Sequence, residues 1–384
     1  MISISTLYCG APLASHGLRY GRRSGRGRPG PVIVYNCTAR CNLACAHCYS
    51  ASGPDAETAG ELTGGEAGAL IDDLAAAGTP VILFSGGEPL LRTDLPDLIA
   101  RAAAAEIRPA VSSNGTLITA AVAAALADAG CAYVGVSLDG LAATHDAFRR
   151  RDGAFTEALA GMDRAAAAGI KVGVRMTLTA DNVADVPGVF GLIVERGVRR
   201  ICFYHLVPSG RGRDGPIDLT AERRRAVLDR IMDLTAEAWA AGRQIEVLTV
   251  DNHADGPYVV LRLLRENPAR AERALELLRA NGGNASGVRL TAVGPTGDVT
   301  PDQFWRQRVL GNVRRRPFSA IWTDPGDELL SALRRRPRPV TGRCAACRWL
   351  DVCNGNLRAR AEAVTADPWA ADPGCHLTEE EISA

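Results

Sequence analysis

The feature that most constrains the fold of this chain is a strand-then-helix pattern that begins at residue 31. Short apolar runs each precede an alanine-rich helical stretch, and six such runs cover residues 32–35, 81–84, 109–112, 133–137, 172–178 and 200–206. Short buried strands that alternate with helices pair in parallel through right-handed crossovers. The pattern therefore predicts an α/β fold, either a doubly wound sheet or a barrel.

The first intervening helix carries clear local signals. Thr63 and Glu66 have the spacing of a capping box, and apolar residues follow at helical spacing through residue 74. Gly78 supplies the C-terminal stop. The sequence therefore predicts a helix between the first two strands.

Polar motifs follow the first four predicted strands. They are CNLACAHCY at 41–49, SGGEP at 85–89, SSNG at 112–115 and SLDG at 137–140. In doubly wound sheets and in barrels, ligands bind at the carboxyl ends of the strands. We therefore expect one active-site face built from these four motifs.

Three regions are expected along the chain. Residues 1–30 form an irregular N-terminal arm whose arginines are either solvated or part of a basic flap on an anionic substrate; they are Arg19, Arg22, Arg23, Arg26 and Arg28. Residues 31–215 form the strand-helix domain. After residue 215 the rhythm changes to long helical segments at 220–241 and 267–281, then to hairpin-like sequence and a cysteine cluster. Residues 216–384 are therefore expected to form a second, helical domain.

The charge balance excludes partners that need a strong global field. The 44 basic and 43 acidic residues nearly cancel, so we expect neither nucleic acid nor an anionic membrane as a partner. Apolar runs are too short for a membrane span, and the start of the chain lacks the pattern of a secretory signal. We expect a cytoplasmic protein, in which most of the 11 cysteines, being clustered, favour metal binding over disulfides.

Cys41, Cys45 and Cys48 form a C-x3-C-x2-C triplet directly after the first strand. Three thiolates suit a [4Fe-4S] cluster with one open iron, because full ligation takes four protein ligands. The alternative is a structural zinc ion, which usually takes four ligands in paired C-x2-C spacing. The triplet therefore favours a cluster whose open iron binds a small molecule.

The triplet and the SGGEP, SSNG and SLDG motifs together resemble the radical S-adenosylmethionine (SAM) superfamily. The resemblance implies a partial (βα)6 TIM-type barrel, in which the open iron chelates the amino and carboxylate groups of SAM. Reduction then cleaves SAM to a 5'-deoxyadenosyl radical, so Cys41, Cys45 and Cys48 are expected to be catalytic as well as metal ligands. It also implies a donor such as reduced ferredoxin or flavodoxin.

The resemblance assigns further SAM contacts. Gly86, Gly87 and Glu88 match the motif that receives the SAM amino group, where glycines let the backbone approach a ligand closely. Tyr49 matches the aromatic residue near adenine. Candidates for the SAM ribose and carboxylate, with turn residues as the alternative for the Ser and Asn positions, are Ser113, Asn114, Ser137 and Arg175.

A second cysteine cluster has the form C-x2-C-x5-C-x21-C and consists of Cys344, Cys347, Cys353 and Cys375. Four thiolates saturate either a second [4Fe-4S] cluster or a zinc ion, and spacing alone does not separate them. Because this cluster of cysteines occurs in the same chain as the triplet, we favour an iron–sulfur cluster over zinc. The segment resembles auxiliary-cluster domains of the SPASM or twitch type. Where the larger modules commonly have a further cysteine this chain has Asp302, so one auxiliary cluster is expected.

The remaining cysteines are not predicted to be ligands. Cys131 and Cys202 lie in apolar contexts that are typical of small buried side chains. Cys37 is close to the triplet, but a fourth protein thiolate would block SAM. Cys9 lies in the arm and indicates nothing.

Further segments narrow the resemblance to the NirJ-type enzymes of haem d1 biosynthesis. They include FYHLVPSGRGR at 203–213, DNHADG at 251–256 and CAACRWLDVCNGNLRARA at 344–361, while His376 departs from an expected tyrosine. The resemblance implies removal of propionate side chains from 12,18-didecarboxysirohaem. Close relatives of these enzymes decarboxylate similar tetrapyrroles in another haem pathway. Such a decarboxylase activity stays an alternative to the haem d1 function.

A polyanionic macrocycle calls for arginine, because guanidinium matches carboxylate bidentately. Candidates, each with plain solvation as the alternative, are Arg211, Arg213, Arg358 and Arg360. His205 or His253 is a candidate ligand of the substrate iron, and the alternative for each is a structural hydrogen bond. The auxiliary cluster is a candidate acceptor for the electron that is left when the side chain departs.

Two other functions compete with this one. A radical SAM peptide maturase would normally carry more auxiliary cysteines and often a peptide-binding extension. A noncatalytic iron–sulfur or haem carrier predicts no SAM cleavage, but the intact Cys41, Cys45 and Cys48 triplet and SGGEP motif argue against it.

Overall fold

The computed structural model describes residues 1–13, 16–20, 30–215 and 217–383. Within them, eleven strands form one sheet in the order β1-β8-β7-β6-β5-β4-β3-β2-β9-β10-β11. The first eight are β1 Ile2–Ser3, β2 Val32–Thr38, β3 Val81–Gly86, β4 Arg108–Ser113, β5 Tyr133–Ser137, β6 Lys171–Leu178, β7 Arg200–His205 and β8 Glu246–Val250. The last three are β9 Leu290–Val293, β10 Asp298–Thr300 and β11 Gly311–Asn312.

The six strands predicted from the apolar runs are β2 to β7. They lie side by side in chain order, and each pairs with its neighbours in parallel. β8 continues the series beside β7, also in parallel. The α/β fold is therefore confirmed, and the carboxyl ends of all these strands lie at one edge of the sheet.

The sheet extends beyond the predicted barrel at both sides. β1 pairs antiparallel with β8, while β9 pairs in parallel with β2 and leads into antiparallel β10 and β11. The outermost strands β1 and β11 do not pair with each other within the described residues, so the barrel is partial. The sheet crosses the boundary expected at residue 216, because β8 to β11 come from the C-terminal part of the chain.

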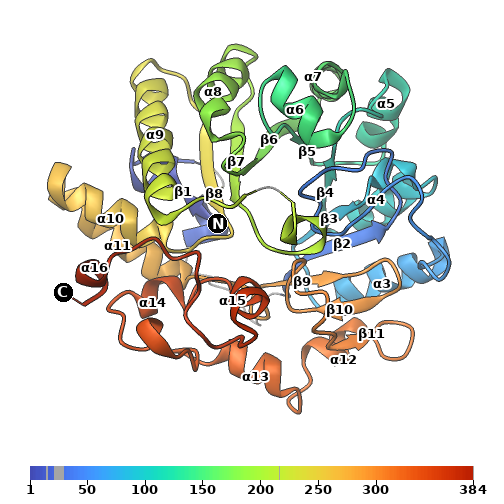
Figure 1. The fold of residues 1–384 in the computed structure, drawn as a ribbon. Helices are drawn as coiled ribbons and strands as arrows, with labels where there is room; N and C mark the ends of the chain where they lie inside the picture. Colours follow the sequence, from blue (N-terminus) through green and yellow to red (C-terminus); the bar gives the residue numbers. More distant parts are fainter. Residues whose placement is uncertain (14–15, 21–29, 216, 384) are drawn as a thin grey trace.

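Helices cover the outer side of this curved sheet (Figure 1). Those between β2 and β8 are α3 Gly64–Ala76, α4 Leu95–Ala104, α5 Ala120–Asp128, α6 Ala142–Arg149, α7 Ala154–Ala167, α8 Val186–Glu195 and α9 Ala221–Ala240. Both halves of the capping box predicted at Thr63 and Glu66 are present at the start of α3. Short 3-10 helices are η1 Pro89–Leu91, η2 Val183–Asp185 and η3 Gly210–Arg213.

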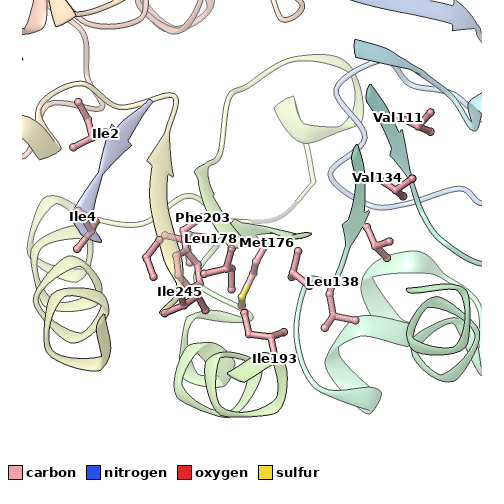
Figure 2. Close-up of a cluster of buried hydrophobic side chains, with 14 of the residues drawn as sticks. Ile2, Ile4, Val111, Val134, Leu138, Met176, Leu178, Ile193, Phe203 and Ile245 are labelled. Atoms are coloured by element: carbon pink, nitrogen blue, oxygen red, sulfur yellow. The ribbon is translucent and has the colours of Figure 1, made fainter. Parts of the chain in front are cut away.

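The main core lies between the sheet and these helices. Val111, Val134 and Met176 from the strands are all buried in this core, and Figure 2 shows Met176 beside Ile193 of α8, with Val111 and Val134 farther along the sheet. Successive strand residues point to opposite faces, so Arg175 of β6 and Cys202 of β7, which are paired in register, lie on the concave side. Cys202 packs there in a cluster separate from the main core.

The N-terminal arm differs from the prediction. Instead of an irregular segment, Ile2–Ser3 forms β1, followed by the buried helix α1 Ile4–Leu7 and by α2 His16–Tyr20. Arg19 forms an ion pair with Glu246 at 2.6 Å, so it is not a flap residue. The other arginines of the predicted flap lie outside the described residues; they are Arg22, Arg23, Arg26 and Arg28.

The C-terminal part lies across the open side of the curved sheet (Figure 1). After the long helices α10 Asp255–Glu266 and α11 Pro268–Asn281, its elements are short; they are α12 Phe318–Trp322, α13 Glu328–Arg334, η4 Gly342–Cys344, α14 Leu350–Cys353, α15 Arg358–Thr365 and α16 Glu379–Ser383. Among the described residues, none of the helices has the length and apolar character to cross a membrane.

Candidate functional site

The predicted cysteine triplet lies in the loop after β2, at the carboxyl edge of the sheet. Cys41 and Cys45 are buried, Cys48 is partly exposed, and the three pack with Leu43 in a cluster of their own. Burial raises the pKa of the Cys41 thiol to about 12, and the nearby Cys45 and Cys48 add to this rise. Thiols gathered in so dry a loop ionise only beside a compensating cation, which is what an iron–sulfur cluster supplies.

A buried ion pair supports this loop from the neighbouring strands. Arg149, at the end of α6, donates from Nη1 to Cys45 Sγ at 3.4 Å and from Nη2 to Asp139 Oδ2. His47 Nε2 lies 3.2 Å from the same carboxylate oxygen. Burial alone would raise the pKa of Asp139, but Arg149 and His47 hold it below its usual range. The SLDG motif thus acts on the cysteine loop through its aspartate.

Gly86 and Gly87 allow the end of β3 to dock on the chain that enters the cysteine loop. The amide of Gly87 donates to Thr38 O, and that of Glu88 to Arg40 O, both at 2.8 Å. A Cβ atom at Gly86 would lie 2.4 Å from Thr38 O, and one at Gly87 would lie 2.0 Å from Arg40 O. The sequence reasoning explained these glycines by the approach of a ligand, whereas the structure shows the approach of backbone to backbone.

Glu88, Ser113 and Asn114 form one hydrogen-bonded unit at the ends of β3 and β4. The fully buried carboxylate of Glu88 accepts from Ser113 Oγ at 2.9 Å and from Asn114 N at 2.8 Å. Burial raises the pKa of Glu88 to about 7. Asn114 also donates to Asn42 Oδ1 at 2.9 Å, within the cysteine loop. The structure thus brings these three predicted residues together beside the triplet.

Ser137 and Arg175 lie opposite each other in the register of β5 and β6. Arg175 donates from Nη1 to Ser112 Oγ at 2.6 Å, while its buried Nε has no hydrogen-bond partner. Gly135 makes room for this guanidinium, because a Cβ atom there would lie 2.4 Å from Nε. Arg175 therefore keeps donor capacity on the concave side of the sheet.

Tyr49 lines a cavity of about 380 Å³ that lies between the cysteine loop and the C-terminal part. Its hydroxyl donates to Asn36 Oδ1 at 2.6 Å, and its ring meets Phe304 edge-on at 5.3 Å between centroids. Arg213 and Arg306 also line the cavity, and both are exposed. The cavity thus combines aromatic walls with two cationic groups and one carboxylate, that of Asp298.

The four C-terminal cysteines come together around η4 and α14. Burial raises the pKa of the Cys353 thiol to about 12, and Cys375, Cys344 and Cys347 add to that rise. Backbone packs tightly here, since a Cβ atom at Gly283 would lie 2.4 Å from the carbonyl carbon of Cys353. The structure thus brings the four predicted thiols into one region, and their role as ligands of one site stays a prediction.

Two buried arginines near the C-terminal cysteines bear on whether this site suits an anionic cluster. Arg338 is 2% exposed and Arg358 is fully buried. Burial lowers the pKa of Arg338 to about 9 and also lowers that of Arg358, whereas Cys353 acts in the opposite direction on both. Buried cations of this kind need a compensating anion. A metal centre held by four thiolates is such an anion, so the residues fit the predicted group.

In the described part of the chain, no three His, Cys, Asp or Glu side chains converge on the position of a single metal ion. A cubane with four irons spreads its ligands more widely than one ion does. The assignment of both cysteine sites to clusters therefore rests on the grouping of their thiols and on the basic groups around them.

Several predicted substrate contacts are wrong. Arg358 and Arg360 are buried, and Arg360 is held by Asp372 at 2.8 Å. Arg211 donates to Cys45 O at 2.8 Å and to Ser52 O at 2.7 Å, so it holds the cysteine loop. Of the four predicted arginine contacts, only Arg213 lines the cavity.

The two candidate iron-binding histidines each contact another group of the protein. His205 Nε2 lies 2.9 Å from Asp255, and both side chains are buried. His253 is buried, and its Nε2 lies 3.3 Å from the terminal amine of Met1. The structural alternative holds for both.

The other cysteines lie where the sequence analysis expected. Cys131 and Cys202 are buried, and Cys37 is fully buried with its thiol 3.3 Å from Ser85 O. The sequence analysis missed Arg149 and Arg338, for which no spacing or motif gave a signal. Asp139 could have been found from the sequence, because it belongs to the SLDG motif.

An open α/β half-barrel with a three-thiol loop at its strand ends and a four-thiol site beside it defines an enzyme class built on iron–sulfur chemistry. Comparison with known families agrees. The Radical SAM superfamily model matches residues 35–193, and the SPASM iron-sulfur cluster-binding domain matches residues 286–348. The chain belongs to the radical SAM superfamily and carries a SPASM domain. These domains imply SAM, a [4Fe-4S] cluster and auxiliary iron–sulfur ligation, which confirms the predicted cofactors.

Two curated relatives are similar over nearly their whole lengths. The Fe-coproporphyrin III synthase of Methanosarcina barkeri is 51% identical and covers 100% of this chain and 99% of its own. The pre-heme d1 synthase of Dinoroseobacter shibae is 43% identical, over 94% of this chain and 89% of its own. The resemblance to haem-pathway enzymes is therefore confirmed.

A solved structure shares the fold. Streptococcus suis SuiB bound to its precursor peptide SuiA superimposes with a TM-score of 0.72 at 13% identity, over 91% of this chain and 76% of its own. At that identity the likeness shows the architecture alone. The choice between tetrapyrrole and peptide therefore rests on the closer sequence relatives and on the site.

Proposed function

We propose that this protein removes carboxylated side chains from an iron tetrapyrrole of a haem pathway. The observation that carries the proposal is a juxtaposition at the carboxyl edge of the sheet. There the triplet loop lies beside a cavity that has aromatic walls and two exposed arginines, Arg213 and Arg306. The names of both curated relatives point to tetrapyrrole products. A flat polyanion matches this combination of aromatic and guanidinium groups.

The cysteine triplet would hold the SAM-binding cluster, with Cys41, Cys45 and Cys48 as its ligands. When bound, this cluster supplies the electron that cleaves SAM to a 5'-deoxyadenosyl radical. Gly86, Gly87 and Glu88 stay our candidates for the SAM amino group.

Ser113 and Asn114 would act by holding the Glu88 carboxylate, since both donate to it. The unpartnered Nε of Arg175 is suited to a carboxylate or ribose oxygen, with Ser137 opposite it. Tyr49 would lie near adenine, because its ring borders the cavity.

Two products are in question, and we propose 12,18-didecarboxysirohaem as the substrate to test for both. A route to haem d1 removes propionates. A route to iron coproporphyrin III keeps four propionates and removes the other carboxylated side chains. The greater identity to the Fe-coproporphyrin III synthase, 51% against 43%, favours the second route over the haem d1 role that the sequence motifs predict.

The remaining parts of the proposal concern context. We propose a barrel domain at 31–215, and a C-terminal domain at 216–384 in which Cys344, Cys347, Cys353 and Cys375 hold an auxiliary [4Fe-4S] cluster. Reduced ferredoxin or flavodoxin would donate the electron. Two thiol-rich sites fit the reducing cytoplasm.

The test is anaerobic incubation of the reconstituted protein with SAM, dithionite and 12,18-didecarboxysirohaem, followed by mass spectrometry of nucleoside and tetrapyrrole. We expect 5'-deoxyadenosine together with a product that co-elutes with iron coproporphyrin III. A product that has lost propionate mass would instead support the haem d1 route. Deoxyadenosine with an unchanged tetrapyrrole would overturn the tetrapyrrole assignment and favour a peptide substrate. The triple variant Cys41→Ala/Cys45→Ala/Cys48→Ala is the control, in which we expect neither product.

A further inference from the structure

Arg338 is buried beside the C-terminal thiols but is held only by neutral groups. Its Nε donates to Leu333 O at 2.9 Å, and its two terminal nitrogens donate to Asn284 Oδ1 and Ser286 O, each at 2.9 Å. Arg338 also contacts the residue that follows Cys353, because its Nη1 lies 3.4 Å from Asn354 O. Nη2 also donates to Asn284 O at 3.3 Å. These five contacts all go to neutral oxygens, so none of them neutralises the positive charge.

Arg358 repeats this arrangement, because it too donates only to neutral groups. Its Nη1 donates to Pro368 O at 3.0 Å and to Ala370 O at 2.6 Å, and its Nη2 donates to Gly355 O. Its Nε is buried without a hydrogen-bond partner. Cys344 and Cys353 are among the negative groups whose fields act on this guanidinium.

The nearby carboxylates are already engaged. Asp372 forms two hydrogen bonds with Arg360, at 2.8 and 3.0 Å, and its charge also acts on Arg358 without a direct contact. Asp302, the other buried carboxyl in this region, accepts from Ser286 Oγ and from Phe304 N, the latter at 2.9 Å. In the described part of the chain, neither Arg338 nor Arg358 has a carboxylate oxygen within ion-pair distance.

Leaving two guanidinium charges buried and unpaired is costly, because a lone ion loses its hydration and gains no counterion. Hydrogen bonds to Asn354 O and Gly355 O hold Arg338 and Arg358 at the segment that follows Cys353. The Cys353 thiol acts on both guanidinium groups and Cys344 also acts on Arg358, while Asp302 and Asp372 act on Arg338 and Arg358 from beyond ion-pair distance. A [4Fe-4S] cluster held by four thiolates carries a net negative charge, and that charge grows by one on reduction. A fixed positive charge in a poorly hydrated site therefore stabilises the reduced cluster more than the oxidised one.

We propose that Arg338 and Arg358 are positioning residues that raise the reduction potential of the C-terminal cluster by compensating its charge. The couple in question is the one-electron reduction of the cluster, in which the electron stays on the cluster and its four thiolates remain bound. The inference rests on the auxiliary cluster but not on which tetrapyrrole the enzyme uses. It makes this site a better electron acceptor than the same four thiolates would be without the arginines.

The test uses the full chain with Cys41→Ala/Cys45→Ala/Cys48→Ala, so that the C-terminal cysteines are the remaining predicted cluster ligands. In this parent, Arg338→Gln and Arg358→Gln remove one charge each, and Arg338→Lys and Arg358→Lys keep it. Arg211→Gln is the matched control, because Arg211, like Arg358, donates to backbone carbonyls but belongs to the other cysteine loop. Each reconstituted protein is titrated with dithionite and mediators, without SAM or tetrapyrrole, and the reduced cluster is followed by electron paramagnetic resonance.

We expect each Gln variant to lower the midpoint potential by a shift equal to at least a tenfold change in the reduction equilibrium, about 59 mV for one electron. The Lys variants should stay nearer to the parent, and Arg211→Gln should match it. Equal midpoints in parent and Gln variants, or equal shifts in Gln and Lys variants, would overturn the inference.

Iron content keeps the test decisive where a variant assembles poorly. Loss of iron from the Gln variants with retention in the Lys variants would support the charge role, because assembly itself would then need the positive charge. Loss from both would assign the arginines to hydrogen-bond geometry and refute it. Zinc in place of iron, with no redox transition in the parent, would refute it as well. A failure of the tetrapyrrole assay changes none of these outcomes.

Discussion

Arg149 joins the SLDG motif to the first cysteine site, because one guanidinium reaches both Cys45 Sγ, at 3.4 Å, and the carboxylate of Asp139. Asp139 in turn accepts from Thr177 N at 2.6 Å, on the neighbouring strand β6. Hydrogen bonds to a cluster sulfur and its ligands orient the site and tune its electronics. The position of the triplet is therefore fixed by β5, α6 and β6 as well as by its own loop.

We expect Arg149→Met to destabilise the fold strongly. The side chains of Arg149 and Asp139 are 6% and 2% exposed, so the substitution leaves a buried carboxylate without its partner. Breaking such a pair typically costs about 3–5 kcal/mol. Chemical unfolding followed by tryptophan fluorescence measures this loss.

A neighbouring arginine supplies the control for this experiment. Arg151 pairs with Glu157, but its side chain is 38% exposed, so Arg151→Met should cost less than about 1 kcal/mol. Equal losses in the two variants would show that burial of the Arg149 pair does not matter to the fold.

The pH dependence of stability should carry a signature of Glu88. Burial raises its pKa to about 7, above the roughly 4.3 of an unfolded chain. The folded state therefore holds this proton more tightly, and the resulting stabilisation is full below about pH 4 and is lost as the pH rises through 7. Glu88→Gln cannot ionise and should lack this loss.

The measurement compares the free energies of unfolding of wild type and Glu88→Gln at pH 4, 5, 6, 7 and 8 without SAM. We expect the wild type to lose on the order of 3 kcal/mol relative to the variant across this range. Parallel pH profiles would show that the Glu88 carboxyl ionises normally in the folded protein.

Much of the fold was predictable because it follows from local patterns. Apolar runs between turn residues predicted the ends of β2 to β7 to within three residues, and the Thr63–Glu66 capping box predicted the start of α3. The hairpin-like sequence after residue 281 forms β9 and β10, but its pairing with β2 was not predicted, and β1 and β8 were missed. The places of these strands in the sheet depend on pairing with residues far away in the sequence. Such pairing leaves no periodic signal.

The residues of the candidate site were predictable only where they recur at a recognisable spacing in the sequence. The two cysteine clusters were found from their intervals, whereas Arg338 and Arg358 owe their roles to burial, which no interval encodes. With 44 basic residues in the chain, sequence alone gave no means to separate buried arginines from solvated ones. This is why Arg358 and Arg360 were wrongly expected to contact substrate.

Gly87→Ala should abolish SAM cleavage without disturbing the C-terminal cluster. The new Cβ atom would lie 2.0 Å from the carbonyl oxygen of Arg40, so the end of β3 has to move away from the cysteine loop. Gly53→Ala is the control. Gly53 lies in the cysteine loop itself, and no atom lies within 4 Å of its added Cβ. Formation of 5'-deoxyadenosine and iron content are measured for both. Normal cleavage by Gly87→Ala would mean that the close docking of these backbones is not needed.

The cavity arginines should control the binding of the proposed tetrapyrrole substrate. Arg213 and Arg306 are exposed to the cavity, and one hydrogen bond to Ser50 O, at 2.7 Å, leaves Arg306 with free donors. A charge-assisted hydrogen bond contributes about 1.5–3 kcal/mol, so Arg213→Gln or Arg306→Gln should weaken binding by about 10- to 100-fold.

The binding constant is obtained from the Soret shift of 12,18-didecarboxysirohaem on titration with each reconstituted protein. Arg196→Gln is the control, because Arg196 follows α8 on the outer side of the sheet and pairs there with Asp163. Added salt should weaken wild-type binding more than binding by the double variant Arg213→Gln/Arg306→Gln, since exposed ion pairs are screened. If both single variants bind as tightly as Arg196→Gln, the carboxylates of the substrate are recognised somewhere other than in this cavity.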